Sequence, residues 1–212
     1  VYFDDVELVV ERPPAVRQPV PKVVLFSDLP ADSPCLASLK TLFEDGLIQS
    51  SAEADAAVPA DVAGVLVLYG QQEMPAAVGD AVRRYAEDGG HVFMDIRNFA
   101  RWHETEAVDV ALGVPEKQPV EERMKAGLRV VAASEVTAGF EVGQVMPRAG
   151  FPEGRLRALP PGFQCPGLEV LAVAPEGQAG LVRMRLGQGW VVAADVLSLR
   201  EPFCRNVDSY YK

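Results

Sequence analysis

Polar side chains that could do chemistry stand where the buried apolar runs of this chain end. Six residues form this candidate ligand-binding set: Asp28, Gln71, Asp95, Arg97, Asp195 and Arg200. The carboxyl ends of parallel strands meet at one edge of an open α/β sheet, so these side chains would line a single crevice. Carboxylates beside an arginine could bind a sugar or a hard cation, or hydrolyse a glycosidic bond if suitably spaced. The structural alternative is that each aspartate caps a helix or pairs with Arg97.

The best-defined unit that would position these residues runs from Pro75 to Asn98. Apolar residues at helical spacing predict a helix that begins at Pro75, and Gly89-Gly90 supplies the turn that ends it. The apolar run from His91 to Met94 then predicts a buried strand that carries Asp95 at its carboxyl end. Trp102-His103 follows, either as an exposed platform on which a sugar could stack or as an anchor of the next helix.

The remaining apolar runs predict a doubly covered, mostly parallel sheet. Strands are expected at 22–26, 47–48 and 65–69, with helices at 34–43 and 104–112. Residues 118–167 read as an irregular excursion from the sheet with short strand candidates at 128–132 and 140–146. Further strands are expected at 168–174, 179–186 and 190–195, the last two as a hairpin. The fold class predicted is α/β and flavodoxin-like, with helices on both faces and a C-terminal β-hairpin.

Composition excludes several classes of function. The chain has 20 basic and 30 acidic residues, and this net charge of −10 disfavours nucleic acid or an anionic membrane as partner. No apolar run approaches the roughly 20 residues that cross a bilayer. The acidic segment 28–32 follows the first strand and would repel phosphate, so we expect no nucleotide cofactor. Cys35, Cys165 and Cys204 lie far apart, which argues against a disulfide framework or a zinc site.

The N-terminal residues suggest a second unit before the α/β domain. Residues 1–12 alternate as a half-buried strand does, and residues 13–21 form a proline-rich linker. The segment around Asp4-Asp5 resembles the last strand of the β-sandwich carbohydrate-binding modules of secreted glycan-processing enzymes. Residues 1–12 would then be that strand, or else an edge strand added to the main sheet. The α/β domain would occupy 22–212 of a longer chain, and this resemblance implies an extracellular or periplasmic compartment.

The order of several later motifs resembles the class I glutamine amidotransferase-like superfamily, within it the ThuA-like and glycosidase-associated branches. The motifs are Val65–Gly70, Tyr85–Gly90 before a strand, Thr137–Phe140, Leu171–Ala174 and Gly187–Asp195. The resemblance implies the fold predicted above. It also implies that catalytic members carry a nucleophilic cysteine among small residues, on a sharp turn after the strand that ends at Asp95.

That catalytic turn is missing from this sequence. Met94-Asp95-Ile96 stands in its place, none of the three cysteines falls there, and His103 and Glu104 are adjacent instead of spaced as a His-x-Glu pair. We therefore expect a non-catalytic accessory or interaction domain of a larger, secreted glycan- or peptide-processing enzyme. Its expected partners are the other domains of that chain and carbohydrate, and its oligomeric state is left open. The alternative is a hydrolase, or a sugar- or metal-binding domain, that uses the strand-end carboxylates.

Overall fold

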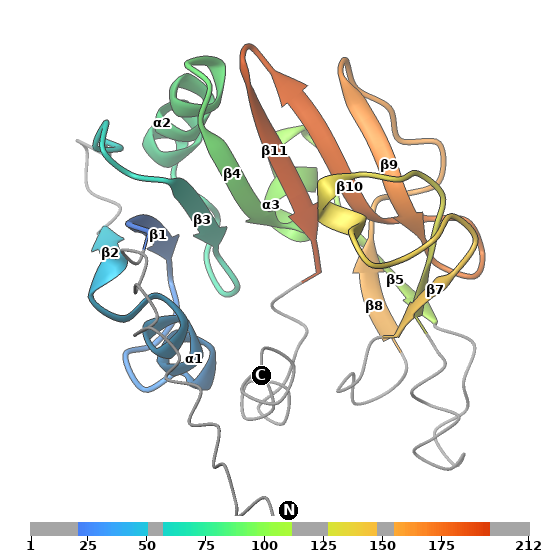
Figure 1. Cartoon of the computed structure of the whole chain (residues 1–212), viewed down its shortest axis with the longest axis horizontal. Helices are drawn as coiled ribbons and strands as arrows, with labels where there is room; N and C mark the ends of the chain where they lie inside the picture. Colours follow the sequence, from blue (N-terminus) through green and yellow to red (C-terminus); the bar gives the residue numbers. More distant parts are fainter. Residues whose placement is uncertain (1–20, 51–56, 112–126, 148–154, 196–212) are drawn as a thin grey trace, which may run out of the picture.

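Apolar runs in the first half of the chain form four parallel neighbouring strands. The computed structural model describes residues 21–50, 57–111, 127–147 and 155–195 (Figure 1). The strands are β1 (Val23–Ser27), β2 (Leu47–Ser50), β3 (Gly64–Leu68) and β4 (His91–Asp95). β1 pairs with β2 and β3, and β3 pairs with β4, all in parallel. The predicted parallel half of the sheet is therefore confirmed.

The second half of the chain completes a nine-stranded mixed sheet. Its strands are β6 (Gly127–Val130), β7 (Val145–Pro147), β9 (Leu168–Val173), β10 (Ala179–Leu186) and β11 (Gly189–Ala194). β10 and β11 form the predicted antiparallel hairpin, and β11 pairs in parallel with β4. The resulting order is β2-β1-β3-β4-β11-β10-β9-β6-β7. A separate two-stranded sheet joins β5 (Val108–Ala111) to β8 (Arg155–Ala158).

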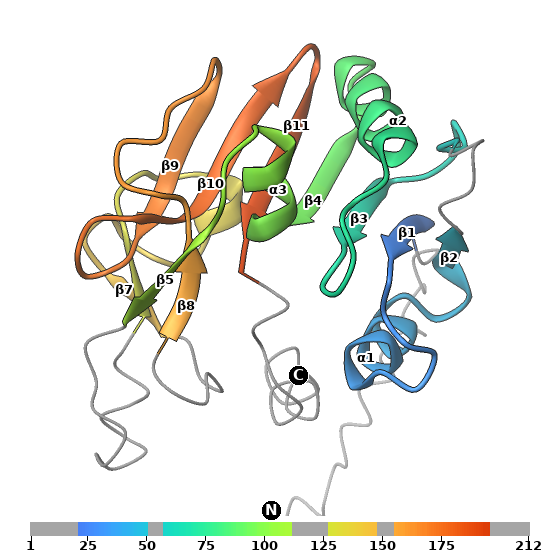
Figure 2. The ribbon, with the colours of Figure 1, turned by 180° about the vertical axis from the view of Figure 1, so that it is seen from behind.

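Helices cover both faces of the parallel half. α1 (Pro34–Phe43) packs its Leu36 against Leu25 and Leu68 on one face. α2 (Ala76–Glu87) and α3 (Ile96–Trp102) cover the other face, as the view from behind shows (Figure 2). Two short 3₁₀ turns, η1 (Glu44–Gly46) and η2 (Glu135–Thr137), complete the described elements. None of the described helices is long and apolar enough to cross a membrane.

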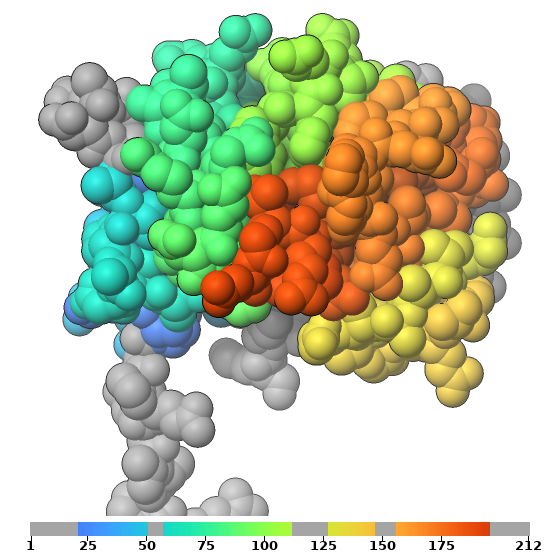
Figure 3. Space-filling model, turned by 90° about the horizontal axis from the view of Figure 1, so that it is seen from above, coloured from blue at the N-terminus to red at the C-terminus, as the bar shows by residue number. Residues whose placement is uncertain are grey.

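Two glycines bring the β10–β11 turn directly against the C-terminal end of α2. The backbone N–H of Gln188 donates to the carbonyl of Glu87 at 3.1 Å, and that of Trp190 donates to the carbonyl of Gly90 at 3.1 Å. A Cβ on Gly189 would clash with the Gly90 carbonyl, and one on Gly90 would clash with the ring of Tyr85. Seen from above, the hairpin turn (red) lies beside the end of α2 and the start of β4 (green), which its side-chain-free contact permits (Figure 3).

The structure corrects two expectations about the middle of the chain. The helix predicted at 104–112 is wrong: α3 begins earlier, at Ile96, and residues 108–111 form β5. Glu104 has a left-handed backbone with φ of 56°, which stops the helix, and the valines after it favour a strand. The described part of 118–167 is also less separate than expected, because β6 pairs with β9 and β7 pairs with β6, both within the main sheet.

Several N- and C-terminal expectations lie outside the described residues. These are the strand at 1–12, the linker as far as residue 20, Arg200 and Cys204.

Candidate functional site

Asp95 ends β4 and caps α3. Its Oδ1 accepts hydrogen bonds from the backbone N–H of Arg97 at 3.0 Å and from the Arg97 side-chain Nε at 3.1 Å. The carboxylate is fully buried, so these donors replace water around the charge. The residue after it, Ile96, is fully buried too. Asp95 therefore has the capping role that the sequence allowed as the alternative to ligand binding.

Asp28 follows β1 and holds the loop after β3. Its Oδ1 accepts from the backbone N–H of Gly70 at 2.7 Å, and its Oδ2 accepts from those of Gln71 and Gln72 at 2.6 Å each. Three charge-assisted bonds from successive N–H groups fix the turn by which the chain leaves β3. Gln71 thus meets Asp28 through its backbone.

Asp195 follows β11 and connects the main sheet to the small one. Its carboxylate is buried and accepts from the backbone N–H of Arg157 in β8 at 2.7 Å. Arg157 was not among the predicted residues, because only the folded chain brings β8 to this edge. Within the described residues, no three His, Cys, Asp or Glu side chains converge as a metal site would need.

No cysteine among the described residues is placed as a nucleophile. Cys35 lies in α1, and Cys165 contacts the sulfur of Met184 at 3.6 Å between the two sulfur atoms. Burial raises the pKa of the Cys165 thiol, which disfavours the reactive thiolate. His91 is exposed at the start of β4 and His103 packs in an aromatic cluster, so neither pairs with a described cysteine.

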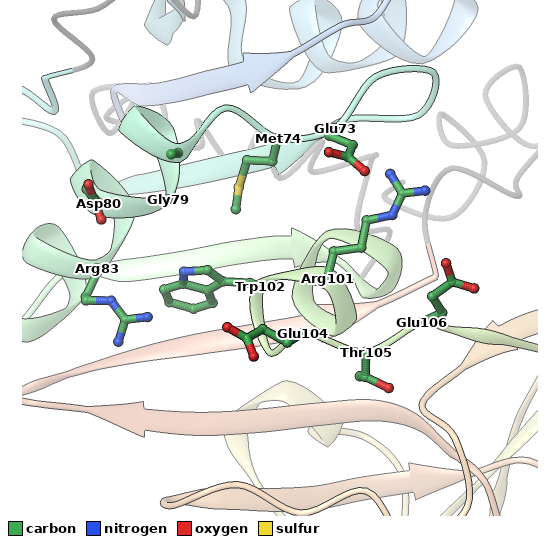
Figure 4. A pocket seen from close by; sticks show the side chains of 11 residues that line it. Glu73, Met74, Gly79, Asp80, Arg83, Arg101, Trp102, Glu104, Thr105 and Glu106 are labelled. Atoms are coloured by element: carbon green, nitrogen blue, oxygen red, sulfur yellow. The ribbon is translucent and has the colours of Figure 1, made fainter.

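A groove between α2 and α3 is the largest described hollow on this face (Figure 4). Its volume is about 610 Å³. The groove is lined by Glu73, Met74, Ala76, Gly79, Asp80, Arg83, Arg101, Trp102, Glu104, Thr105 and Glu106. We call it the α2–α3 groove. The charged side chains are exposed, whereas Met74 and Trp102 are half-buried and form its apolar part.

Trp102 lies at the centre of the α2–α3 groove. The guanidinium carbon of Arg83 lies 4.9 Å from the centre of its ring, within the range of a cation–π contact. Its indole also lies close to Gly79, whose missing side chain leaves the ring uncovered on that side. Sequence reasoning had named Trp102 as a stacking platform or an anchor. It did not find the surrounding charges, because α2 and α3 bring them together only in the fold.

His103 supports Trp102 from behind. Its ring centroid lies 4.7 Å from that of Phe99, 5.5 Å from that of Trp102 and 5.8 Å from that of Phe163. Its Nε2 is buried and has no hydrogen-bond partner among the described residues. Burial, and secondarily the positive charge of Arg83, lower the pKa of His103 below its ordinary value.

Comparisons by sequence give no relative. No family model matches the chain. No curated protein matches it either.

Solved structures share its fold at low identity. The N-terminal domain of mmIFT52 superposes with a TM-score of 0.54 at 11% identity, over 90% of this chain and 96% of that one. The cytoplasmic protein STM1381 from Salmonella typhimurium LT2 gives 0.52 at 13%, over 89% and 94%. The exo-β-1,4-mannosidase Op5Man5 from Opitutaceae bacterium strain TAV5 gives 0.49 at 15%, over 91% of this chain. The chain spans about a third of that mannosidase, 34%.

These likenesses, all at 15% identity or less, concern the fold alone. The structural neighbours, which also include a putative GMP synthase component from Thermoplasma acidophilum and a putative ThuA-like protein, are class I glutamine amidotransferase-like proteins. The chain has the class I glutamine amidotransferase-like fold.

Proposed function

We propose that this chain is a non-catalytic accessory or interaction domain of a larger, exported enzyme that processes glycans or peptides. The observation that carries the proposal is the position of Asp95. It occupies the turn where catalytic members of the superfamily would hold a nucleophile, and it is buried as the cap of α3. A side chain fixed in this way is engaged in stabilising the fold.

The other strand-end aspartates support the same proposal. Asp28 accepts three backbone hydrogen bonds, and buried Asp195 accepts one from Arg157. A general base or nucleophile must be free to reach a substrate and exchange a proton. Each of these carboxylates would have to give up a structural contact to do so.

The alternative is a hydrolase that uses the same carboxylates. An activity screen separates the two: ammonia release from glutamine, and hydrolysis of aryl glycosides and of peptides, with and without Mg²⁺ or Ca²⁺. We expect no turnover above the rate of a heat-inactivated sample. Asp95→Asn is the matched variant, since asparagine also caps helices and would preserve α3 while removing the carboxylate. Turnover by the wild type that this folded variant lacks would overturn the proposal.

A second measurement tests the accessory role itself. In the longer enzyme that the proposal assumes, deletion of residues 22–212 should weaken substrate binding or stability and leave the chemical step of the remaining domain intact. A deletion that changes neither would count against an accessory role.

A further inference from the structure

The α2–α3 groove combines a half-buried indole with exposed charges of both signs. We propose that it binds a neutral saccharide, stacked on Trp102 and hydrogen-bonded by the surrounding carboxylates and guanidiniums. The inference rests on the proposed accessory function and gives that function a ligand class. The volume of about 610 Å³ lies in the range of small-ligand sites, about 300–1,000 Å³.

The charges around the groove select for a neutral ligand. Four carboxylates line it (Glu73, Asp80, Glu104 and Glu106), together with two guanidiniums (Arg83 and Arg101). Among the described residues, none of these six groups forms an ion pair within the groove. A cation would meet the two arginines, and an anion would meet the four carboxylates. Sugar hydroxyls both donate and accept, so they can satisfy acceptor carboxylates and donor guanidiniums together.

The indole of Trp102 can be made available, in contrast to that of Trp190. Arg183 lies over Trp190 at 4.3 Å from its ring centre and is held there by ion pairs to Glu169 at 2.6 Å and Glu135 at 2.8 Å. Arg83 over Trp102 has no such ion pair in the described part of the chain. A cation–π contact at an exposed site contributes about 0.5–1 kcal/mol. Arg83 can therefore swing aside and hydrogen-bond a ligand that takes its place on the ring.

The test uses the full 212-residue chain and neutral oligosaccharides: mannotriose, cellotriose and maltotriose. The chain has two tryptophans, so Trp190→Phe leaves Trp102 as the sole indole reporter. We expect a saturable fluorescence change with at least one of these sugars. The affinity should vary less than twofold between 50 and 500 mM NaCl, because a neutral ligand has no charge for salt to screen.

Calorimetric titration of variants locates the binding site. Trp102→Ala should weaken binding at least tenfold, whereas Trp190→Phe should keep it within twofold of the wild type. Glu104→Gln and Arg101→Gln replace exposed side chains and leave the core untouched, and each should weaken binding several-fold. They keep the test informative if Trp102→Ala fails to fold, as judged by circular dichroism.

Three outcomes would overturn the inference: no saturable binding of any of the three sugars, binding that Glu104→Gln and Arg101→Gln leave unchanged, or preferential binding of amino acids or charged peptides that salt abolishes. Failure of the proposed non-catalytic role is a separate result. Absence of sugar binding leaves that role intact, whereas turnover lost in Asp95→Asn would overturn it without bearing on the groove.

Discussion

Asn98 in α3 pairs with the backbone of Tyr69 through both atoms of its side-chain amide. The N–H of Tyr69 donates to Oδ1 at 3.0 Å, and Nδ2 donates to the Tyr69 carbonyl at 2.9 Å. The asparagine is 1% exposed and satisfies the backbone just past the end of β3, as a neighbouring strand would. This pair fastens α3, and with it Trp102, to the parallel sheet.

Asn98→Ala should lower the free energy of unfolding by about 2–3 kcal/mol, because it leaves a buried donor and acceptor unpaired. Chemical denaturation followed by circular dichroism measures this change. Arg101→Ala, at an exposed position of the same helix, is the control and should change stability by less than about 0.5 kcal/mol. Equal effects of the two variants would contradict the role given to Asn98.

Asp28→Ala should destabilise the fold by about 2 kcal/mol, since three backbone N–H groups lose a charged acceptor and regain only water. Hydrogen exchange should show the amides of Gly70, Gln71 and Gln72 exchanging faster in the variant. Asp32→Ala, on the same loop and exposed, supplies the comparison. Unchanged exchange at the three amides would show that Asp28 does not hold this loop.

His103 should make stability depend on pH. Its pKa in the folded protein is lowered, mainly by burial, from an ordinary value of 6.5, so the unfolded chain binds the proton more readily. The free energy of unfolding should therefore fall as pH drops through 6.5 toward the folded pKa. His103→Phe keeps an aromatic ring and removes an unpartnered Nε2, so it should flatten this fall between pH 8 and 5 without loss of stability at pH 8.

The control for this pH effect is His91→Gln, which replaces the other histidine of the chain, at an exposed position. The His103-dependent fall should persist in that variant. Identical pH profiles for His103→Phe and the wild type would show that the buried ring does not link protonation to unfolding.

Two glycine substitutions should act in opposite directions. Gly79→Ala adds a helix-favouring methyl at ordinary contact distance, 3.4 Å from the Met74 methyl carbon and 3.6 Å from the Trp102 indole nitrogen. It should raise stability by about 0.5–1 kcal/mol. Gly90→Ala places a Cβ against the ring of Tyr85 and should lower stability by about 1–3 kcal/mol. Thermal unfolding measures both, and a stabilising Gly90→Ala would contradict the packing described.

Much of the fold could be predicted because buried strands are written as short apolar runs. Val23–Ser27, Gly64–Leu68 and the hairpin of β10 and β11 all have local signals. The start of α3 was missed because Asp95 was interpreted as a strand end, although a residue can end a strand and cap a helix at once. The pairing of β6 with β9 was missed because it joins residues more than 40 positions apart, and no local pattern encodes it.

The candidate site was predictable only in part. Strand periodicity placed Asp28, Asp95 and Asp195 after parallel neighbouring strands, and the pairing of β1, β3, β4 and β11 agrees. Their hydrogen-bond partners could not be predicted beyond Arg97, because the N–H groups of Gly70 and Arg157 reach them only through folding. The α2–α3 groove likewise depends on the angle between two helices.

The position of β11 has a consequence for how the chain matures on the ribosome. β11 is the last described strand in sequence, yet it lies between β4 and β10. A nascent chain that lacks it would leave one side of β4 without its partner, and an unpaired strand edge invites association with other chains. Synthesis of this one strand therefore marks the step at which the growing polypeptide passes from an aggregation-prone intermediate to a closed sheet.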